Sequence, residues 1–188
     1  MTGENLFLAL LGKDDIRAVY KYLLCRDFPK SERKPLSAIL RAYRRGDYQA
    51  FGLTEDGETI LAYAFFVRTG EDYLLDYLAT DADRRSQGIG SAFLSLLKEH
   101  FRPAASLIAE VEDPDAAGNE EERVIRTRRL AFYEKNGFVK TNYTPTTFGV
   151  PFLVIAPEGK VPSDVRAVYH AHYEKMLPRA VLRRAICD

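Results

Sequence analysis

The stretch from residue 74 to residue 93 has the residue types that can bind a phosphate. An apolar strand leads through a short polar loop into a helix that opens around Gly88 and Gly90. The first turn of a helix presents unpaired backbone N–H groups and the positive end of the helix dipole, so it attracts anions. Glycine lets a phosphate approach the backbone closely, and Arg84 or Arg85 can add a charged hydrogen bond. These features predict a phosphate-bearing ligand.

A purely structural interpretation of the two glycines stays open, because glycine also permits close packing of a helix on a sheet. Two common nucleotide-binding motifs are excluded. The dinucleotide-binding motif needs a third glycine within a parallel strand–helix–strand unit, and the P-loop needs Gly-Lys followed by Ser or Thr. The sequence contains neither pattern at this place.

Carboxylates on predicted strands form a second group of candidates. A carboxylate in a site can act as a general base, which takes a proton from a reacting group. Glu110 and Glu112 share one face of the strand 106–112, because side chains alternate along a strand. Two neighbouring carboxylates can raise the pKa of one of them toward neutrality, which suits a base. Glu110, deeper in the strand, is the preferred base, and Glu112 is either a substrate-binding residue or a solvated side chain.

Asp76 is a carboxylate within the otherwise apolar strand 74–79. Burial of an unpaired charge is costly, so this side chain needs a partner or a wet cleft. Two interpretations follow: Asp76 binds the ammonium group of a substrate, or it simply faces solvent.

Two motifs in the correct order resemble those of one enzyme superfamily. Residues 85–90, Arg-Ser-Gln-Gly-Ile-Gly, match the Arg/Gln-x-x-Gly-x-Gly/Ala signature of the GNAT (general N-acetyltransferase) superfamily. Residues 132–138, Phe-Tyr-Glu-Lys-Asn-Gly-Phe, are similar to its second motif, a helix that bears a tyrosine and ends in Gly-Phe. The order of predicted elements also matches, from the first strand to about Ala156. The sequence most resembles uncharacterised bacterial members that carry a Phe-Pro-x-x-Glu element, here at 28–32.

The resemblance implies that acetyl-CoA is the acyl donor and that no metal is needed. In the family, acetyl-CoA lies in a V-shaped split, here between the strand that ends at Thr80 and the strand 106–112. The pyrophosphate would rest on the amides of 85–91, the pantetheine arm would pair with Leu78 and Thr80, and an amide near Leu78 would hold the oxyanion. The implied cofactor-binding residues are Leu78, Ala79, Thr80, Arg85, Ser86, Gln87, Gly88, Ile89, Gly90 and Ser91.

The resemblance also assigns roles to single residues. Tyr133 would be the general acid that protonates the leaving CoA thiolate, although a tyrosine packed only as an aromatic remains the alternative. Glu32 lies where the family builds its acceptor pocket and would attract a cationic substrate. Arg126 stands where many members have an asparagine, which puts one pantetheine contact in doubt. It either reaches CoA phosphates or belongs to a solvated helix face.

The bulk composition excludes several classes of protein. The 188 residues are 46% hydrophobic and 29% charged, with 27 basic and 27 acidic side chains, so no surplus of positive charge points to nucleic acid. The sequence shows neither a secretory signal pattern nor an apolar run long enough to span a bilayer, so we expect a cytoplasmic protein without a membrane partner. Cys25 and Cys187 have no metal-ligand spacing, and reduced thiols are favoured over a disulfide.

The patterns predict a single α+β domain covering 1–188, with a GNAT-like core at about 5–156 and a helical C-terminal extension at about 162–185. Seven strands are expected in a mixed, mostly antiparallel sheet flanked by helices, at 5–11, 48–53, 58–68, 73–80, 106–112, 138–148 and 151–156. Residues 113–123 are expected to form a loop, and Ser163 to cap the last helix. That helix would cover a sheet edge or form a homodimer interface.

The predicted function is N-acetyl transfer from acetyl-CoA to a primary amine, by direct attack within a ternary complex. A non-catalytic acyl-CoA-binding sensor is the alternative from another class, and an enzyme with a longer acyl donor is a third. The acceptor, a small-molecule or peptide amine, is not specified by the sequence, because such folds share the donor site and vary the acceptor site.

Overall fold

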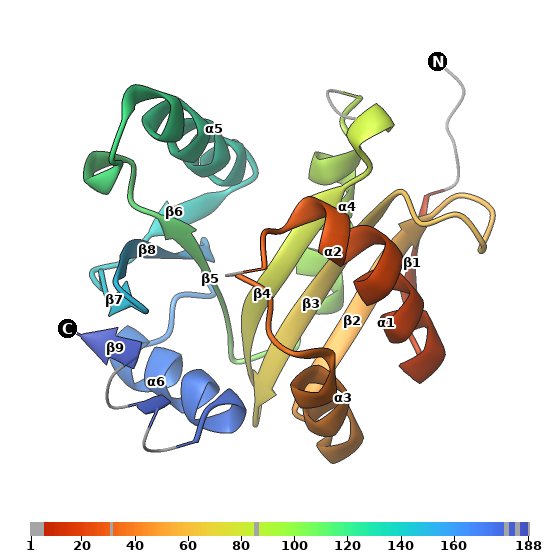
Figure 1. The fold of residues 1–188 in the computed structure, drawn as a ribbon, viewed down its shortest axis with the longest axis horizontal. Coiled ribbons are helices and arrows are strands. Elements are labelled where there is room, and N and C mark those ends of the chain that lie inside the picture. Colours follow the sequence, from red (N-terminus) through yellow and green to blue (C-terminus); the bar gives the residue numbers. More distant parts are fainter. Residues whose placement is uncertain (1–5, 31, 85–86, 179–180, 183–184, 188) are drawn as a thin grey trace. The chain divides into compact units, whose positions relative to one another are not determined.

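The computed structural model describes residues 6–30, 32–84, 87–178, 181–182 and 185–187 (Figure 1). They fall into two compact units. Unit 1 comprises the chain up to Arg68 together with Asp76–Arg102, and unit 2 comprises Thr69–Leu75 together with the chain from Pro103 onward. The divisions between the units fall within two strands, between Arg68 and Thr69 and between Leu75 and Asp76.

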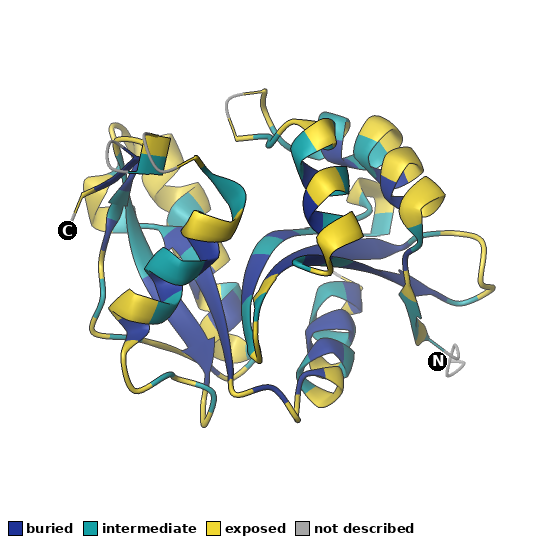
Figure 2. Cartoon of the chain, turned by 90° about the horizontal axis from the view of Figure 1, so that it is seen from below, coloured by how far each residue is buried: buried dark blue, intermediate teal, exposed yellow. Residues whose placement is uncertain are grey.

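Unit 1 is built on strands β1 (Phe7–Leu10), β2 (Tyr48–Thr54), β3 (Ala62–Thr69) and the second half of β4 (Asp72–Thr80). They neighbour one another in that order, and β2 pairs antiparallel with both β1 and β3. The residues of β2 and β3 are almost all buried, as expected for strands covered on both faces. Figure 2 shows these strands as largely buried, and their aromatic residues Tyr48, Phe51, Tyr63, Phe65 and Phe66 are fully buried.

The helices of unit 1 are α1 (Lys13–Val19), the π-helical turn η1 (Tyr20–Leu24), α2 (Cys25–Asp27), α3 (Leu36–Arg45), the short turn η2 (Ala82–Arg84) and α4 (Ile89–His100). Figures 1 and 2 show α1 and α3 on one face of the strands and α4 on the other. Helix α3 ends at Gly46, whose φ of +80° is the left-handed conformation that glycine adopts at helix ends. Helices therefore cover both faces of the unit 1 strands.

Unit 2 is organised around strand β5 (Ser106–Glu112). Its first residues pair in parallel with the start of β4, from Asp72–Ser106 to Leu75–Ala109, and its last residues pair antiparallel with β8 (Val150–Pro157). The shorter strands β6 (Phe138–Lys140) and β7 (Thr146–Thr147) also pair with β8, and β9 (Ile186–Cys187) pairs with β7. The helical elements are η3 (Pro114–Ala116), α5 (Glu120–Lys135) and α6 (Val165–Met176).

The predicted α+β class with a mixed, mostly antiparallel sheet is confirmed, but three local expectations were wrong. The described chain has nine strands rather than seven, since the stretch 138–148 is split into β6 and β7, and β9 is added. Pro145 lies at the break, where proline cannot donate a ladder hydrogen bond. Helix α5 begins at Glu120, within the expected loop, because Asn119 caps it by accepting from the Glu122 amide at 2.9 Å. Asp164, not Ser163, caps α6, through the Ala167 amide at 2.9 Å.

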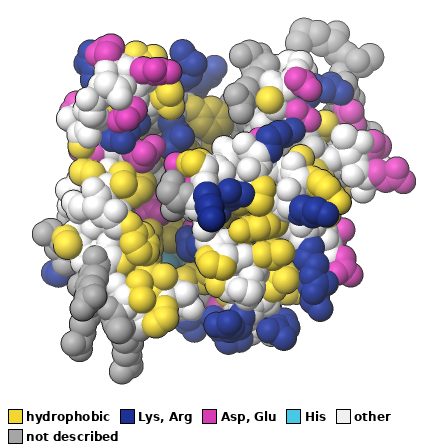
Figure 3. Space-filling model, viewed as in Figure 1, with side chains coloured by type: hydrophobic (Ala, Val, Ile, Leu, Met, Phe, Trp, Pro, Cys, Tyr) yellow, Lys and Arg dark blue, Asp and Glu magenta, His cyan; other side chains and the backbone are white. Residues whose placement is uncertain are grey.

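No helix in the described part of the chain combines the length and the apolar character needed to cross a bilayer. The face seen in Figure 3 carries both basic and acidic side chains, in keeping with the equal numbers of the two in the sequence.

Candidate functional site

The predicted phosphate-binding loop lies in unit 1, between β4 and α4 (Figure 1). Gly88 precedes the first turn of α4 and has a φ of +84°, a conformation that residues with a Cβ rarely adopt. Within the described residues, this first turn carries no acidic side chain and no side-chain cap. Its backbone amides therefore keep the positive character that attracts an anion.

The other predicted cofactor-binding residues flank this turn. Leu78, Ala79 and Thr80 end strand β4 and are half-buried, and Gln87 is exposed before the helix. Ile89 packs into the core, so its amide rather than its side chain would serve a ligand. The remaining residues of the set are Gly90 and Ser91 within α4, and Arg85 and Ser86, which fall outside the described residues.

Asp76 is buried in unit 1, and its carboxylate has partners within the chain. The side chain is 2% exposed and accepts hydrogen bonds from the Lys34 ammonium and the Tyr48 hydroxyl. Burial, together with the charge of Asp76, raises the pKa of Tyr48 well above its usual value, so this phenol remains a donor. Asp76 thus pairs with the ammonium group of Lys34 and does not face solvent; its role toward a substrate ammonium stays a prediction.

The segment that carries Lys34 is fixed to β4 by further contacts. The Tyr77 hydroxyl donates to the Glu32 carbonyl at 2.9 Å and accepts from the Lys34 amide at 2.8 Å. The Phe28 ring packs edge-on against the Tyr77 ring, with centroids 5.0 Å apart. The side chain of Glu32, the predicted acceptor-binding residue, is exposed on this segment. Glu32 lies on the segment before α3, and Asp76 lies on β4. The contacts of Tyr77 and Lys34 join these two parts of unit 1.

Replacing Lys34 with Met should lower the free energy of unfolding by about 3 kcal/mol, because it leaves the buried Asp76 carboxylate without its cation. Denaturant unfolding monitored by circular dichroism measures the change. Arg123→Met is the matched control: Arg123 pairs with Glu120 at 2.7 Å, but both side chains are largely exposed, so the loss should stay below about 1 kcal/mol. Equal losses in the two variants would contradict a structural role for the Lys34–Asp76 pair.

Glu110 lies on β5 in unit 2 and receives hydrogen bonds from two tyrosines of α6. The Tyr169 hydroxyl donates to Oε2 at 2.5 Å, and the Tyr173 hydroxyl contacts Oε1 at 2.8 Å and Oε2 at 3.0 Å. Both tyrosines are buried. The carboxylate of the predicted base is therefore held on both of its oxygens.

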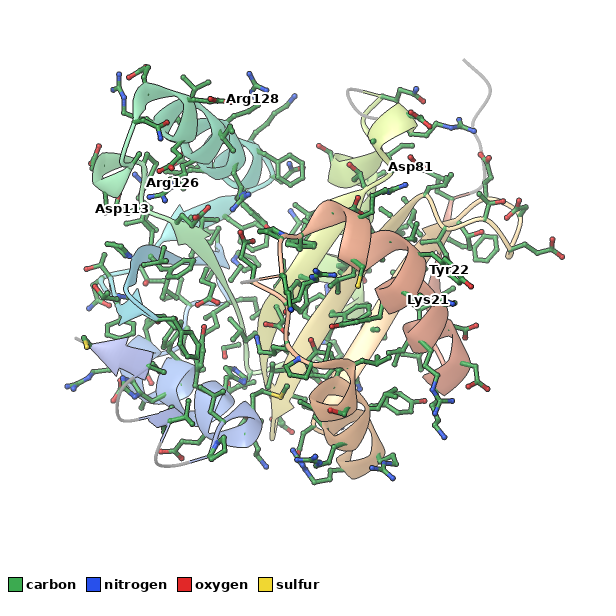
Figure 4. The ribbon with its side chains drawn as sticks, in the orientation of Figure 1. Lys21, Tyr22, Asp81, Asp113, Arg126 and Arg128 are labelled. Atoms are coloured by element: carbon green, nitrogen blue, oxygen red, sulfur yellow. The ribbon has the colours of Figure 1, made fainter. Side chains whose placement is uncertain are left out.

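Glu112, two residues further along the same strand, is paired with arginines of α5. Its carboxylate lies 2.9 Å from Arg129 Nη1 and 3.4 Å from Arg126 Nη2. Arg126 is 12% exposed and also donates to the Asp113 carbonyl at 3.1 Å (Figure 4). The arginine that replaces the family asparagine is thus largely buried against β5 and does not belong to a solvated face.

Tyr133, the predicted general acid, is a buried residue of α5. Its ring packs against Phe132 and Phe138, with centroid distances of 5.4 and 5.2 Å. Burial raises the pKa of Tyr133 to about 12, slightly opposed by the charge of Arg129. Among the described residues its hydroxyl makes no hydrogen bond, so the phenolic proton is not committed to a structural partner.

Sequence reasoning missed Lys34, Tyr48, Tyr169 and Tyr173 as partners of the candidate carboxylates. Tyr169 and Tyr173 of α6 carried a signal, because a buried phenol needs a hydrogen-bond partner. Their spacing of four residues on one helix face was the available signal. A cavity of about 290 Å³ in unit 2 contains none of the predicted site residues; it is lined by Asp113, Pro114, Asp115, Thr127, Leu130, Lys140 and Leu153. Across the described ranges, no group of three or more His, Cys, Asp or Glu side chains could hold a metal ion.

Comparison with known proteins agrees with this arrangement of loop, strands and helices. The model of the acetyltransferase (GNAT) domain family matches residues 46–140, which include the loop before α4 and Tyr133. The chain belongs to this family, and it is an acyl-CoA-dependent N-acyltransferase. No curated relative matches the sequence.

Solved structures of similar fold include several members of the same family. A GNAT-family protein from Bacteroides thetaiotaomicron is 23% identical, with a TM-score of 0.62 over 80% of this chain and 86% of that one. A ribosomal-protein-alanine N-acetyltransferase from Escherichia coli is 26% identical, with a TM-score of 0.54 over 81% of this chain and 92% of that one. The spermidine N-acetyltransferase of Vibrio cholerae, a dodecamer, is 11% identical, with a TM-score of 0.56 over 80% of this chain and 93% of that one.

Proposed function

We propose that this protein transfers the acetyl group of acetyl-CoA directly to a primary amine within a ternary complex. The observation that carries the proposal is the start of α4, after β4 and η2, where Gly88 and the other described residues provide no side-chain cap for the first-turn amides. The pyrophosphate of acetyl-CoA would bind there, on residues 85–91, with the pantetheine arm along Leu78, Ala79 and Thr80. Family membership supports the same assignment.

The proposed chemistry uses Glu110 as base and Tyr133 as acid. Glu110, directly or through a water, takes a proton from the ammonium group, and the neutral nitrogen attacks the thioester carbonyl. A backbone amide near Leu78 stabilises the oxyanion. As the carbon–sulfur bond breaks, the Tyr133 hydroxyl gives its proton to the CoA sulfur. The raised pKa of Tyr133, about 12, keeps this proton in place at neutral pH.

We propose a cationic amine as the acceptor, either a small molecule or a peptide, with Glu32, Asp76 and Glu112 as the acidic residues that attract it. The exposed Glu32 is the strongest candidate, because the side chains of Asp76 and Glu112 are only 2% and 24% exposed. The Escherichia coli relative acts on an alanine of a ribosomal protein and the Vibrio cholerae protein on spermidine, so both acceptor types belong in a test panel.

The transfer mechanism is tested by initial rates measured over a grid of acetyl-CoA and acceptor concentrations. Direct transfer predicts double-reciprocal lines that intersect, and mass spectrometry should find no acetylated protein when the amine is omitted. Parallel lines with an acetylated protein would show a covalent intermediate and would overturn the proposed mechanism.

Gly88→Val should raise the Kd for acetyl-CoA by about tenfold or more. A β-branched side chain is strained at a φ of +84°, by about 1–2 kcal/mol, so the turn must rearrange and the Cβ would meet the phosphate. Isothermal titration calorimetry measures the affinity. Gly159→Val provides a matched control, because Gly159 has a φ of +80° and equally open surroundings in unit 2. It should lose similar stability and bind acetyl-CoA normally; a parallel loss of affinity would show that Gly88 acts through stability alone.

A further inference from the structure

Helix α6 contacts the proposed base through two buried hydroxyl groups. Tyr169 and Tyr173 lie one helical turn apart, and both donate to the carboxylate of Glu110, at 2.5 Å and 2.8 Å for the shortest contacts. The Tyr169 hydroxyl is also 2.7 Å from Thr147 Oγ1 of β7, and the two phenol rings pack 4.9 Å apart. The arrangement fixes both carboxylate oxygens and both phenols.

Packing alone does not account for the two tyrosines, because phenylalanine would fill nearly the same space without burying a polar hydroxyl group. Burial, reinforced by the negative charge of Glu110, raises the pKa of both phenols above the usual value. They therefore remain protonated donors wherever Glu110 is charged. A carboxylate that accepts such hydrogen bonds is stabilised in its charged form.

These residues lie outside residues 46–140, the part of the chain that matches the family model. We propose that α6 is part of the catalytic apparatus, with Tyr169 and Tyr173 as positioning residues that hold the Glu110 carboxylate oriented and charged. The inference rests on the proposed function, in which Glu110 is the base. It assigns a catalytic role to the C-terminal extension.

Several polar side chains on the strands and the helix of unit 2 that carry or flank Glu110 have partners of their own. Val154, its register partner on β8, cannot ionise. On β4 the Asp72 carboxylate accepts from Ser106 at 2.6 Å, and on β5 Glu112 is paired with arginines of α5. The two histidines of α6 bond other hydroxyls: His172 bonds that of Thr69 and His170 that of Tyr143, each at 3.0 Å. The hydrogen bonds from the two phenols hold both oxygens of Glu110, so their removal should shift its titration.

The test is a carbon-13 NMR titration of the full chain labelled at the glutamate carboxyl carbons, which needs no acceptor. Glu110→Gln assigns the Glu110 signal by removing it. Loss of one donor favours the protonated carboxyl, so Tyr169→Phe and Tyr173→Phe should each move the Glu110 midpoint up by about one pH unit. Tyr143→Phe removes the hydroxyl that bonds His170 on the same helix and should leave the midpoint in place.

The titration and the pH dependence of turnover together separate this inference from the proposed function. In the expected result, the acidic limb of kcat/KM moves upward in both α6 variants by the same amount as the NMR midpoint. An unchanged midpoint in both variants, with their folds confirmed by thermal unfolding, would overturn the inference while leaving Glu110 as base. If Glu110→Gln retained full turnover and the wild-type acidic limb, the base assignment itself would fail. If only one of the two variants folds, an unchanged midpoint in that variant overturns the inference.

Discussion

Tyr133→Phe should lower kcat about 100-fold and leave the Kd for acetyl-CoA unchanged. The variant removes one oxygen atom from a buried ring and keeps its packing against Phe132 and Phe138. General acid catalysis by a positioned side chain contributes about 10²–10⁴-fold, so the loss of the only proposed proton donor should approach the lower figure. Among the described residues the hydroxyl makes no structural hydrogen bond, so its removal should cost little stability.

The pH dependence of the wild type follows from the same residue. A general acid works in its protonated form, and burial raises the pKa of Tyr133 to about 12. Activity should therefore show no basic limb from this group below about pH 11.

Both predictions for Tyr133 are measured as CoA release at saturating acetyl-CoA. Tyr22→Phe is the control for Tyr133→Phe, because Tyr22 is 64% exposed on η1. A Tyr133→Phe enzyme with wild-type kcat would exclude the acid role.

Glu110→Gln should lower kcat/KM for the amine about 100-fold, because a neutral amide cannot accept the ammonium proton. The two α6 phenols can still donate to the amide oxygen, so the fold around β5 should persist. The pH profile gives the sharper result: the acidic limb seen in the wild type should disappear.

Glu112→Gln is the informative companion to that variant. Glu112 shares the strand face of Glu110, but its carboxylate is held by Arg126 and Arg129. We expect its loss to raise the KM of the acceptor with little change in kcat. A larger fall in kcat for Glu112→Gln than for Glu110→Gln would reverse the assignment of the base.

The sequence predicted the elements whose signals are local. The strand 106–112 follows from the period-two alternation of its side chains and was placed correctly. The turn at Gly88 was predicted from a second local signal, the glycines that open a helix after a polar loop. Local signals also misled: Ser163 and Asp164 are both good caps, and only the three-dimensional path of the chain selects Asp164.

The partners of the candidate carboxylates could not be predicted, because they are distant in the sequence. The tertiary fold brings Lys34 to Asp76 and Tyr173 to Glu110, and no periodic pattern in the sequence links either pair. The sequence could state that a buried Asp76 needs a partner, but not which residue supplies it. Arg126 was equally ambiguous, since a run of arginines on a helix is exposed in most proteins and here one of them is largely buried.

The most direct test of the central claim is CoA release from acetyl-CoA, measured against a panel of primary amines that includes polyamines, amino acids, aminoglycosides and alanine-initiated peptides. The account predicts that CoA appears only when one class of amine is present, together with an equal amount of the N-acetylated amine. Tight binding of acetyl-CoA without release of CoA for any amine in the panel would contradict the proposed enzyme and favour an acyl-CoA sensor.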